Sequence, residues 1–236
     1  RANGTLASEP VVNIHTEDIG EAGLMGLALH PNFTQNHLMY VYHTYAKNGG
    51  LYNKVLILTE KNNKIVNSKI ILDGIPASDS NNGGRIKFGP DGKLYVSTGD
   101  SETPELAQNT KSLAGKLLRL NDDGTIPDDN PIPESPVYSY GHRDIQGFAW
   151  HPITKKLYAS EHGPAGNDEV NIIEPGSNYG WPIEVCNHST SSAPIRFETP
   201  EYCFNPEIAP SGLTIAASNK LGYQNDILFT TLRGSH

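Results

Sequence analysis

Residues 85–100 read RIKFGPDGKLYVSTGD. The two ends of this segment, RIKF and KLYVST, alternate apolar and polar side chains with the period of two that is typical of β-strands. The Gly-Pro-Asp-Gly between them has the composition of a tight turn. The segment therefore predicts a β-hairpin. The polar, glycine-containing stretch SNNGG at residues 80–84 lies where the first strand begins.

The same arrangement, a turn between two short apolar strands, recurs along the chain. Its copies are residues 26–44, 86–100, 147–163 and 213–234. Further strand-like runs lie between them, at residues 54–59, 69–72, 115–120 and 169–173. Two hairpins per repeat make a four-stranded blade, and blades repeated around an axis make a β-propeller. We therefore expect an all-β fold, a β-propeller of four-stranded blades, with a sandwich of coincidentally similar hairpins as the alternative.

The spacing of the repeats predicts long loops. The equivalent positions Tyr40, Tyr95, Tyr158 and Phe229 are 55, 63 and 71 residues apart, whereas common propeller repeats have roughly 40–50 residues. Long loops on one face of a propeller usually form its site. A propeller ring closes with its last blade beside its first, so we expect residues 1–236 to form a single propeller domain that is incomplete at both ends.

The charge composition indicates which kinds of ligand or partner the protein could bind. The chain has a formal net charge of −8 and a pI near 5.5, and its 18 Lys and Arg residues form no dense cluster. This balance opposes a nucleic-acid partner and favours cations or neutral ligands. No apolar run approaches the roughly 18 residues that a membrane span needs, so none is expected.

Cysteines and glycosylation motifs favour an extracytoplasmic location. The two cysteines, Cys186 and Cys203, lie in a segment rich in Ser, Thr and Pro, where a disulfide would close a loose loop. Two free buried thiols are the alternative. Asn-x-Ser/Thr motifs begin at Asn3, Asn32 and Asn187, which predicts a secreted, periplasmic or cell-surface glycoprotein, although such triplets also arise by chance.

Several longer runs, taken together, resemble one family. They are GEAGLMGLALHPNF at 20–33, NNGGRIKFGPDGKLYVSTGD at 81–100, LAGKLLRLNDDGTIPDDNP at 113–131, YGHRDIQGFAWHP at 140–152, SEHGPAGNDEVNIIEPGSNYGWP at 160–182 and IAPSGL at 208–213. Their order and spacing are similar to those of the soluble pyrroloquinoline quinone-dependent glucose and aldose sugar dehydrogenases, the glucose/sorbosone dehydrogenase family. The resemblance implies a six-bladed propeller, about four blades of which this chain supplies, and hydride transfer from C1 of an aldose to the quinone.

The resemblance also implies calcium sites. The carbonyls of Gly163 and Pro164 match those that hold the calcium beside the quinone, and hard oxygen ligands suit Ca²⁺. Glu169 and the carbonyl of Tyr179 match a second calcium site, and Asp168 matches a residue near the sugar. A plain turn and a solvated acidic pair are the alternatives.

Four further residues match cofactor positions. Arg143 matches an arginine that stabilises the quinone, although the following Asp144 could neutralise it. Arg233 matches a basic residue against a quinone carboxylate, with an exposed arginine at a strand end as the alternative. Tyr202 or Phe204 could supply the aromatic wall on which a planar quinone stacks, with ordinary core packing as the alternative.

Two positions depart from the family pattern. The sugar dehydrogenases have a His base at the position of Asn81, and an amide orients a hydroxyl but does not accept its proton. Glu21 stands where the quinone enzymes compared have Gln, and a carboxylate beside an anionic quinone repels it unless it is protonated or bridged by metal. His162 is the nearest candidate for a replacement base.

Two functions therefore stay open. The first is a dehydrogenase of reduced or absent activity that uses the quinone and Ca²⁺ and passes electrons to an artificial or protein acceptor. The second is a calcium-stabilised cell-surface propeller that binds a protein or glycan, because the resemblance extends to propellers similar to the hedgehog-interacting protein. The acidic segment at residues 121–131 has the wrong spacing for an EF-hand, and we expect it to be a turn between blades.

Overall fold

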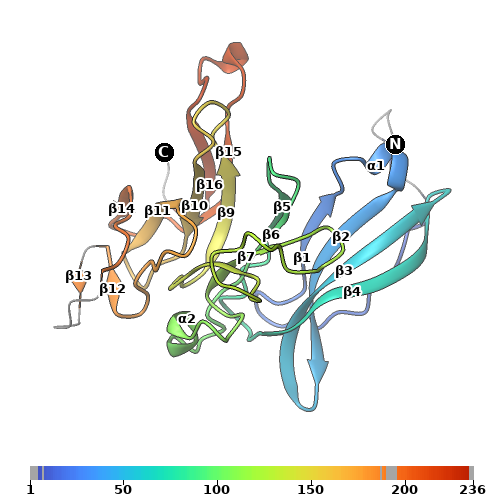
Figure 1. Ribbon diagram of the computed structural model, residues 1–236, viewed down its shortest axis with the longest axis horizontal. Helices are drawn as coiled ribbons and strands as arrows, with labels where there is room; N and C mark the ends of the chain where they lie inside the picture. Colours follow the sequence, from blue (N-terminus) through green and yellow to red (C-terminus); the bar gives the residue numbers. More distant parts are fainter. Residues whose placement is uncertain (1–4, 7, 187, 190–195, 234–236) are drawn as a thin grey trace.

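The structure is a computed structural model that describes residues 5, 6, 8–186, 188, 189 and 196–233. Its regular structure is almost entirely β (Figure 1). Three antiparallel four-stranded sheets follow one another along the chain, and a fourth sheet has two strands among the described residues. These sheets are the expected propeller blades, and each begins with one of the four repeated hairpins.

The strands of each blade are consecutive, with one exception in the third. Blade one contains β1 (Leu24–Leu29), β2 (Leu38–Lys47), β3 (Gly50–Lys61) and β4 (Lys64–Pro76). Blade two contains β5 (Ile86–Phe88), β6 (Leu94–Ser97), β7 (Lys116–Leu120) and β8 (Val137–Tyr140). Blade three contains β9 (Ile145–Trp150), β10 (Leu157–Glu161), β11 (Asp168–Ile173) and β14 (Tyr202–Phe204), and blade four contains β15 (Pro210–Ile215) and β16 (Ile227–Thr231).

The remaining elements are short. They are α1 (Phe33–Asn36), α2 (Glu105–Gln108), the 3₁₀ helix η1 (Asn219–Leu221) and the two-stranded ribbon of β12 (Glu184–Val185) and β13 (His188–Ser189). No helix in the described part of the chain is long and apolar enough to cross a membrane.

The hairpin that opens blade two forms as predicted. The Gly89 N–H donates to the Lys93 carbonyl at 2.9 Å, and the Gly92 N–H donates to the Gly89 carbonyl at 3.0 Å. Gly92 has φ +74°, a left-handed conformation that glycine adopts without steric cost. The turn therefore sets the register of β5 against β6, with Ile86 opposite Val96.

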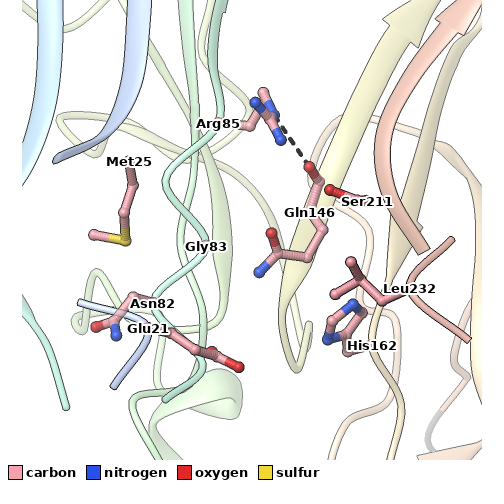
Figure 2. A pocket seen from close by; sticks show the side chains of 9 residues that line it. All are labelled: Glu21, Met25, Asn82, Gly83, Arg85, Gln146, His162, Ser211 and Leu232. Atoms are coloured by element: carbon pink, nitrogen blue, oxygen red, sulfur yellow. Dashed lines mark hydrogen bonds between the residues drawn. The ribbon is translucent and has the colours of Figure 1, made fainter. Parts of the chain in front are cut away.

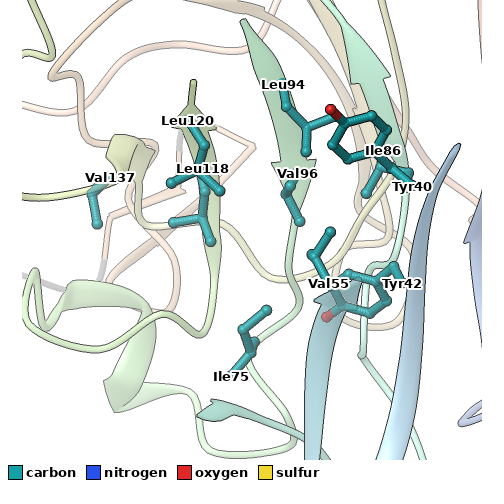
Figure 3. Packing of buried hydrophobic residues seen from close by; sticks show 10 residues of the cluster. All are labelled: Tyr40, Tyr42, Val55, Ile75, Ile86, Leu94, Val96, Leu118, Leu120 and Val137. Carbon is teal, nitrogen blue, oxygen red and sulfur yellow. The ribbon is translucent and has the colours of Figure 1, made fainter. Parts of the chain in front are cut away.

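The hydrophobic core lies between successive blades. Strand alternation turns Tyr40 and Tyr42 of β2 toward Leu94 and Val96 of β6 and Leu118 of β7, and this cluster fills the first interface (Figure 3). A second cluster joins blades two and three, and includes Tyr95, Leu117, Ile145, Phe148 and Leu157. A third, formed by Ala149, Leu213 and Ile215, joins blades three and four. Face-to-face burial of this kind is what holds propeller blades side by side.

A lysine links three of the blades. Lys87 of β5 donates through Nζ to the Phe148 carbonyl of β9 at 2.7 Å and to the Leu213 carbonyl of β15 at 3.0 Å. Burial lowers the pKa of Lys87 to about 8. The first strands of blades two, three and four therefore lie close together, and the site forms beside them.

The sequence led us to expect the acidic segment at residues 121–131 to be a turn between two blades, and this prediction was wrong. The segment connects β7 to β8 inside blade two. Arg119 of β7 reaches into it and donates to the Asp129 carboxylate through both Nη1 and Nη2, at 2.8 and 3.0 Å. Arg119 also donates to Asn130 Oδ1 at 2.9 Å. The segment is thus held by a buried arginine, which accounts for its polar composition.

The disulfide forms as predicted. Cys186 and Cys203 are bonded, with their Cα atoms 5.7 Å apart, and the bond ties the loop after β12 to the edge strand β14. Of the three glycosylation motifs, Asn32 is exposed, whereas Asn3 and Asn187 lie outside the described residues.

Candidate functional site

All four blades, through their strands or the loops next to them, contribute to one cavity, which we call the central cavity. Its volume is about 250 Å³. Figure 2 shows its side chains on two facing walls, one from blades one and two and one from blades three and four. The lining residues are Glu21, Met25, Asn82, Gly83, Arg85, Gln146, His162, Ser211 and Leu232.

Glu21 and Asn81 are hydrogen-bonded to each other, but only Glu21 lines the central cavity. The Asn81 backbone N–H donates to Glu21 Oε2 at 3.0 Å. The Asn81 side chain turns the other way and donates through Nδ2 to the buried Asp100 Oδ1 at 2.9 Å. Asn81 has φ +52°, a strained conformation for a residue with a side chain. The residue predicted to orient the substrate is therefore held by protein groups on both sides.

Asp144 lies buried behind the central cavity. Its Oδ1 accepts the Gly83 N–H at 2.9 Å, and its Oδ2 accepts the Gln146 side chain at 2.9 Å. Burial raises the pKa of Asp144. The carboxylate is thus engaged by Gly83 and Gln146 rather than by Arg143, so the neutralisation of Arg143 considered from the sequence is not observed.

His162 has a defined tautomer. Its Nε2 lies 2.8 Å from the Pro210 carbonyl oxygen, which can only accept, so Nε2 carries the proton. Its Nδ1 lies 3.9 Å from Asp144 Oδ2. The ring is therefore fixed between blade four and the buried carboxylate.

Arg85 is the only Arg or Lys among the described residues that line the central cavity. Its Nε donates to the Gln146 carbonyl at 3.1 Å (Figure 2). Neither of its Nη nitrogens has a hydrogen-bond partner within the described residues. Burial lowers the pKa of Arg85. A guanidinium with unused donors beside a cavity is suited to binding a carboxylate.

A second cavity, which we call the acidic cavity, brings together the predicted metal residues. Its volume is about 10 Å³, close to the space that a single water needs. Its lining contains the four predicted residues Gly163, Pro164, Glu169 and Tyr179. The other lining residues are Arg143, Glu161, Trp181, Glu184 and Val185.

Two carboxyl groups of the acidic cavity have strongly raised pKa values. Burial raises the pKa of Glu169 to about 7 and that of Glu161 to about 8, and the nearby Glu161 charge adds to the shift of Glu169. Glu169 Oε1 accepts the Cys186 N–H at 2.8 Å. Glu161 Oε2 lies 2.8 Å from Nδ1 of the buried His142, whose pKa burial lowers to about 3. Buried carboxyl groups that repel each other form a favourable environment for a cation.

Arg143 lies between the two cavities. Its Nη1 donates to the carbonyls of His162 at 3.2 Å and Gly163 at 2.9 Å. Its guanidinium lies 5.7 Å from the centre of the Trp181 ring, within the range of a cation–π interaction. Arg143 thus contacts the turn that carries the predicted calcium ligands.

Asp168 is buried and satisfied by backbone amides. Its Oδ1 accepts the Gly163 N–H at 3.0 Å, and its Oδ2 accepts those of Ile208 and Ala209 at 2.8 and 2.7 Å. It lines neither the central nor the acidic cavity. Asp168 therefore joins the turn at Gly163 to the chain that enters blade four.

The remaining predicted cofactor residues lie around a third cavity. Tyr202 and Phe204 line a space of about 670 Å³, together with Phe229 of β16. The Tyr202 and Phe204 rings lie 4.6 Å apart. Arg233 forms an ion pair with Glu207, which also lines this third cavity. We call it the aromatic cavity. The structure thus separates Tyr202, Phe204 and Arg233 from the lining of the central cavity.

Comparison with known proteins identifies the family. Residues 1–236 match the family model described as Glucose / Sorbosone dehydrogenase. The chain belongs to the glucose/sorbosone dehydrogenase family.

Named relatives within this family span more than the present chain. The aldose sugar dehydrogenase YliI of Escherichia coli is 32% identical in an alignment of 229 residues that covers 89% of this chain and 62% of that protein. Quinoprotein glucose dehydrogenase B of Acinetobacter calcoaceticus is 37% identical in an alignment of 193 residues that covers 69% of this chain and 40% of that protein. The chain thus spans about half of the length of these relatives.

A solved structure of the family has the same fold. The PQQ-bound form of the aldose sugar dehydrogenase of Streptomyces coelicolor superposes with a TM-score of 0.76 and is 39% identical. The match covers 85% of this chain and 59% of the solved chain. The propeller fold of this glucose/sorbosone dehydrogenase family member is therefore supported by sequence and structure together.

Sequence reasoning missed several residues of the two cavities. Arg85 and Gln146 stood inside recognised runs, but nothing in their spacing indicated that they face one cavity from different blades. Glu161 and Glu184 lie far apart in the chain, and only the fold brings them together in the acidic cavity. The one available signal was the position of Arg85, directly after the SNNGG stretch at the start of a blade.

Proposed function

We propose that the protein is an oxidoreductase that uses Ca²⁺ and pyrroloquinoline quinone to remove hydride from C1 of an aldose. Membership of the glucose/sorbosone dehydrogenase family and the likeness to a PQQ-bound relative support this function. The observation that carries the proposal is the central cavity, where the two Nη nitrogens of Arg85 have no partner within the described residues, next to the turn at Gly163 and Pro164. When bound, the quinone supplies the acceptor for the hydride.

The residues of the central cavity fit a quinone that bears carboxylates. Arg85 is its only Arg or Lys among the described residues, and both Nη nitrogens are free to donate to an anion. Arg233, which the sequence suggested for this role, is paired with Glu207. We therefore propose Arg85 as the residue that binds a quinone carboxylate. Arg143 would act from the side of the acidic cavity, where it donates to the Gly163 carbonyl and so orients it.

The acidic cavity fits a single cation. It offers the carboxyl groups of Glu161, Glu169 and Glu184 beside Gly163 and Tyr179, and oxygen ligands are what Ca²⁺ requires. The cavity is small enough for one ion. We propose that these oxygens hold Ca²⁺ and that Asp168, through the Gly163 N–H, positions the turn without contacting the sugar.

The location proposed for the protein is extracytoplasmic. The Cys186–Cys203 bond supports this, because disulfides persist in oxidising compartments and are rare in the cytosol. An aldose would be the electron donor, and an artificial dye or a protein would take electrons from the reduced cofactor.

One observation favours the second candidate, a calcium-stabilised propeller that binds a protein or glycan without catalysis. Asn81 supplies no basic group, and its amide is held by Asp100. A positioned base typically contributes about 10²–10⁴ in rate, so its loss without replacement would leave little activity.

A spectrophotometric titration separates the two candidates. Pyrroloquinoline quinone is added to the full-length protein in the presence of Ca²⁺, and aldoses and an artificial electron acceptor follow. The enzyme is expected to shift the quinone absorbance and then to bleach it when an aldose is added. A protein that leaves the quinone spectrum unchanged at every Ca²⁺ concentration would contradict the proposed function.

A further inference from the structure

We propose that Glu21 accepts the proton of the anomeric hydroxyl, the role that the family resemblance implies for position 81. This inference rests on the proposed function and assigns its proton transfer to a residue. Four observations carry it: the engagement of Asn81, the anchoring of the Glu21 backbone, the free oxygen of Glu21, and the absence of another Asp or Glu from the described lining of the central cavity.

Asn81 donates hydrogen bonds from both its side chain and its backbone. Its side-chain Nδ2 donates to Asp100 Oδ1, and the other oxygen of Asp100 accepts the Trp181 indole N–H at 2.8 Å. Its backbone N–H donates to Glu21 Oε2 at 3.0 Å. The left-handed conformation of Asn81 aims that N–H at Glu21. The backbone of Asn81 therefore holds the Glu21 carboxylate beside position 81.

The backbone of Glu21 is fixed against the same loop. The Glu21 N–H donates to the Asp79 carbonyl at 2.6 Å. The preceding Gly20 has φ +59°, and a Cβ added there would lie 2.2 Å from the Asp79 carbonyl oxygen. Only glycine permits this approach. Two hydrogen bonds with this loop, one from the Glu21 backbone N–H and one to its carboxylate, thus hold Glu21 at the edge of the cavity.

Only one carboxylate oxygen of Glu21 is occupied. Oε2 accepts from Asn81, whereas Oε1 has no hydrogen-bond partner within the described residues. The side chain is exposed and extends into the space between the two walls of the central cavity (Figure 2). A base must come within hydrogen-bond reach of the hydroxyl that it deprotonates, and Glu21 lines the cavity with an Oε1 that is available to such a hydroxyl.

Asp144 and His162 are the other groups near the cavity that could accept a proton. Asp144 is buried, and both of its oxygens accept hydrogen bonds, from Gly83 and Gln146. His162 gives its Nε2 proton to the Pro210 carbonyl, and its Nδ1 lies 3.9 Å from Asp144 Oδ2, beyond hydrogen-bond distance, so His162 is the second candidate acceptor of the proton. Among the described residues that line the central cavity, Glu21 is the only Asp or Glu.

The proposed step oxidises C1 of the aldose by two electrons. The C1–H bond breaks and its electron pair leaves with the hydrogen to an o-quinone acceptor, while the O–H proton of the anomeric hydroxyl passes to Glu21 Oε1. The C1–O bond becomes a carbonyl, so the aldose leaves as a lactone. The exposed Glu21 carboxyl then releases its proton to water.

The test compares Glu21→Gln, Glu21→Ala and Glu105→Gln in full-length protein loaded with Ca²⁺. Glu105 is an exposed residue of α2 outside the central cavity, so Glu105→Gln is the matched control. Quinone affinity is measured by absorbance titration, and a single turnover with aldose gives the rate of quinone reduction. Glu21→Gln is expected to bind the quinone at least as tightly as the wild type and to reduce it more slowly by about 10²–10⁴-fold.

Chemical rescue distinguishes proton transfer from a structural role. Formate added to Glu21→Ala is expected to restore part of the rate, because a small carboxylate can occupy the vacated position, and the control rate is expected to stay unchanged. A Glu21→Gln rate within twofold of the wild type, with quinone bound, would overturn the role of Glu21 and leave the proposed function standing. Failure of the wild type to bind quinone would overturn both.

Discussion

Arg143 Nη1 donates to the carbonyl oxygen of Gly163 at 2.9 Å. Gly163 lines the acidic cavity, and the preceding His162 lines the central cavity, so this contact lies where the two cavities meet. A carbonyl oxygen has two lone pairs and can accept from a guanidinium while it coordinates a cation. The arginine therefore fixes the orientation of a proposed calcium ligand without excluding the metal.

The two Nη nitrogens of Arg85, which have no partner within the described residues, lead to a prediction about quinone affinity. We expect Arg85→Met to weaken quinone binding by about 10–100-fold, because hydrogen bonds to charged groups contribute roughly 1.5–3 kcal/mol. Arg233→Met is expected to change the affinity less than threefold, since Arg233 is paired with Glu207. Absorbance titration of both variants at saturating Ca²⁺ measures the difference. A larger loss in Arg233→Met than in Arg85→Met would show that the carboxylate binds elsewhere.

The three amides on Asp168 lead to a prediction about stability. Asp168→Asn replaces one oxygen by an NH₂ group that cannot accept from Ile208 and Ala209. We expect a loss of about 2–4 kcal/mol in the free energy of unfolding, measured by urea denaturation. Asp128→Asn, which changes an exposed carboxylate, is the control and is expected to have little effect. Equal stability of the two variants would mean that the Asp168 contacts contribute little.

The raised pKa of Glu169 leads to a prediction about pH. Burial raises this pKa from its ordinary 4.5 to about 7. Below pH 4.5 the group is protonated in both states, between the two values only the folded state holds the proton, and above pH 7 it is ionised in both. The free energy of unfolding of calcium-free protein should therefore fall as the pH rises from about 4.5 to about 7.

The matching variant is Glu169→Gln, which keeps an acceptor for the Cys186 N–H. Urea denaturation in a chelator, at pH 5 and pH 7.5, is expected to show a smaller decrease for this variant than for the wild type. Some decrease should persist, because Glu161 has a pKa raised in the same direction. An identical decrease in both proteins would exclude Glu169 as its source.

The blade architecture could be predicted because it is encoded locally. Each repeated hairpin carries its own alternation of apolar and polar side chains and its own turn, as at Gly89–Gly92. The four hairpins begin the four sheets that form the blades. The outer strands were harder to predict. β14 has three residues, pairs with β11 and carries Cys203 of the disulfide, and β8 follows a long polar loop. Neither has enough alternation to stand out from its surroundings.

The site could be predicted only in part. The metal residues from Gly163 to Tyr179 are close in sequence, and the structure gathers them around one small cavity. The contacts of Asn81 with Glu21 and Asp100 cross 60 and 19 residues of chain and depend on a left-handed backbone, which no side-chain pattern reveals. For the same reason the sequence could not distinguish Arg85, which faces the cavity, from Arg233, which does not.

The most direct test of the central claim is a crystal structure of the full-length protein with Ca²⁺ and pyrroloquinoline quinone. We predict quinone density in the central cavity, with a carboxylate on Arg85, and anomalous signal from a cation at the Gly163 and Pro164 carbonyls. Glu21 should lie on the side of the quinone that is open to a sugar. Quinone density in the aromatic cavity at Tyr202 and Phe204, or none at saturating concentration, would contradict the account.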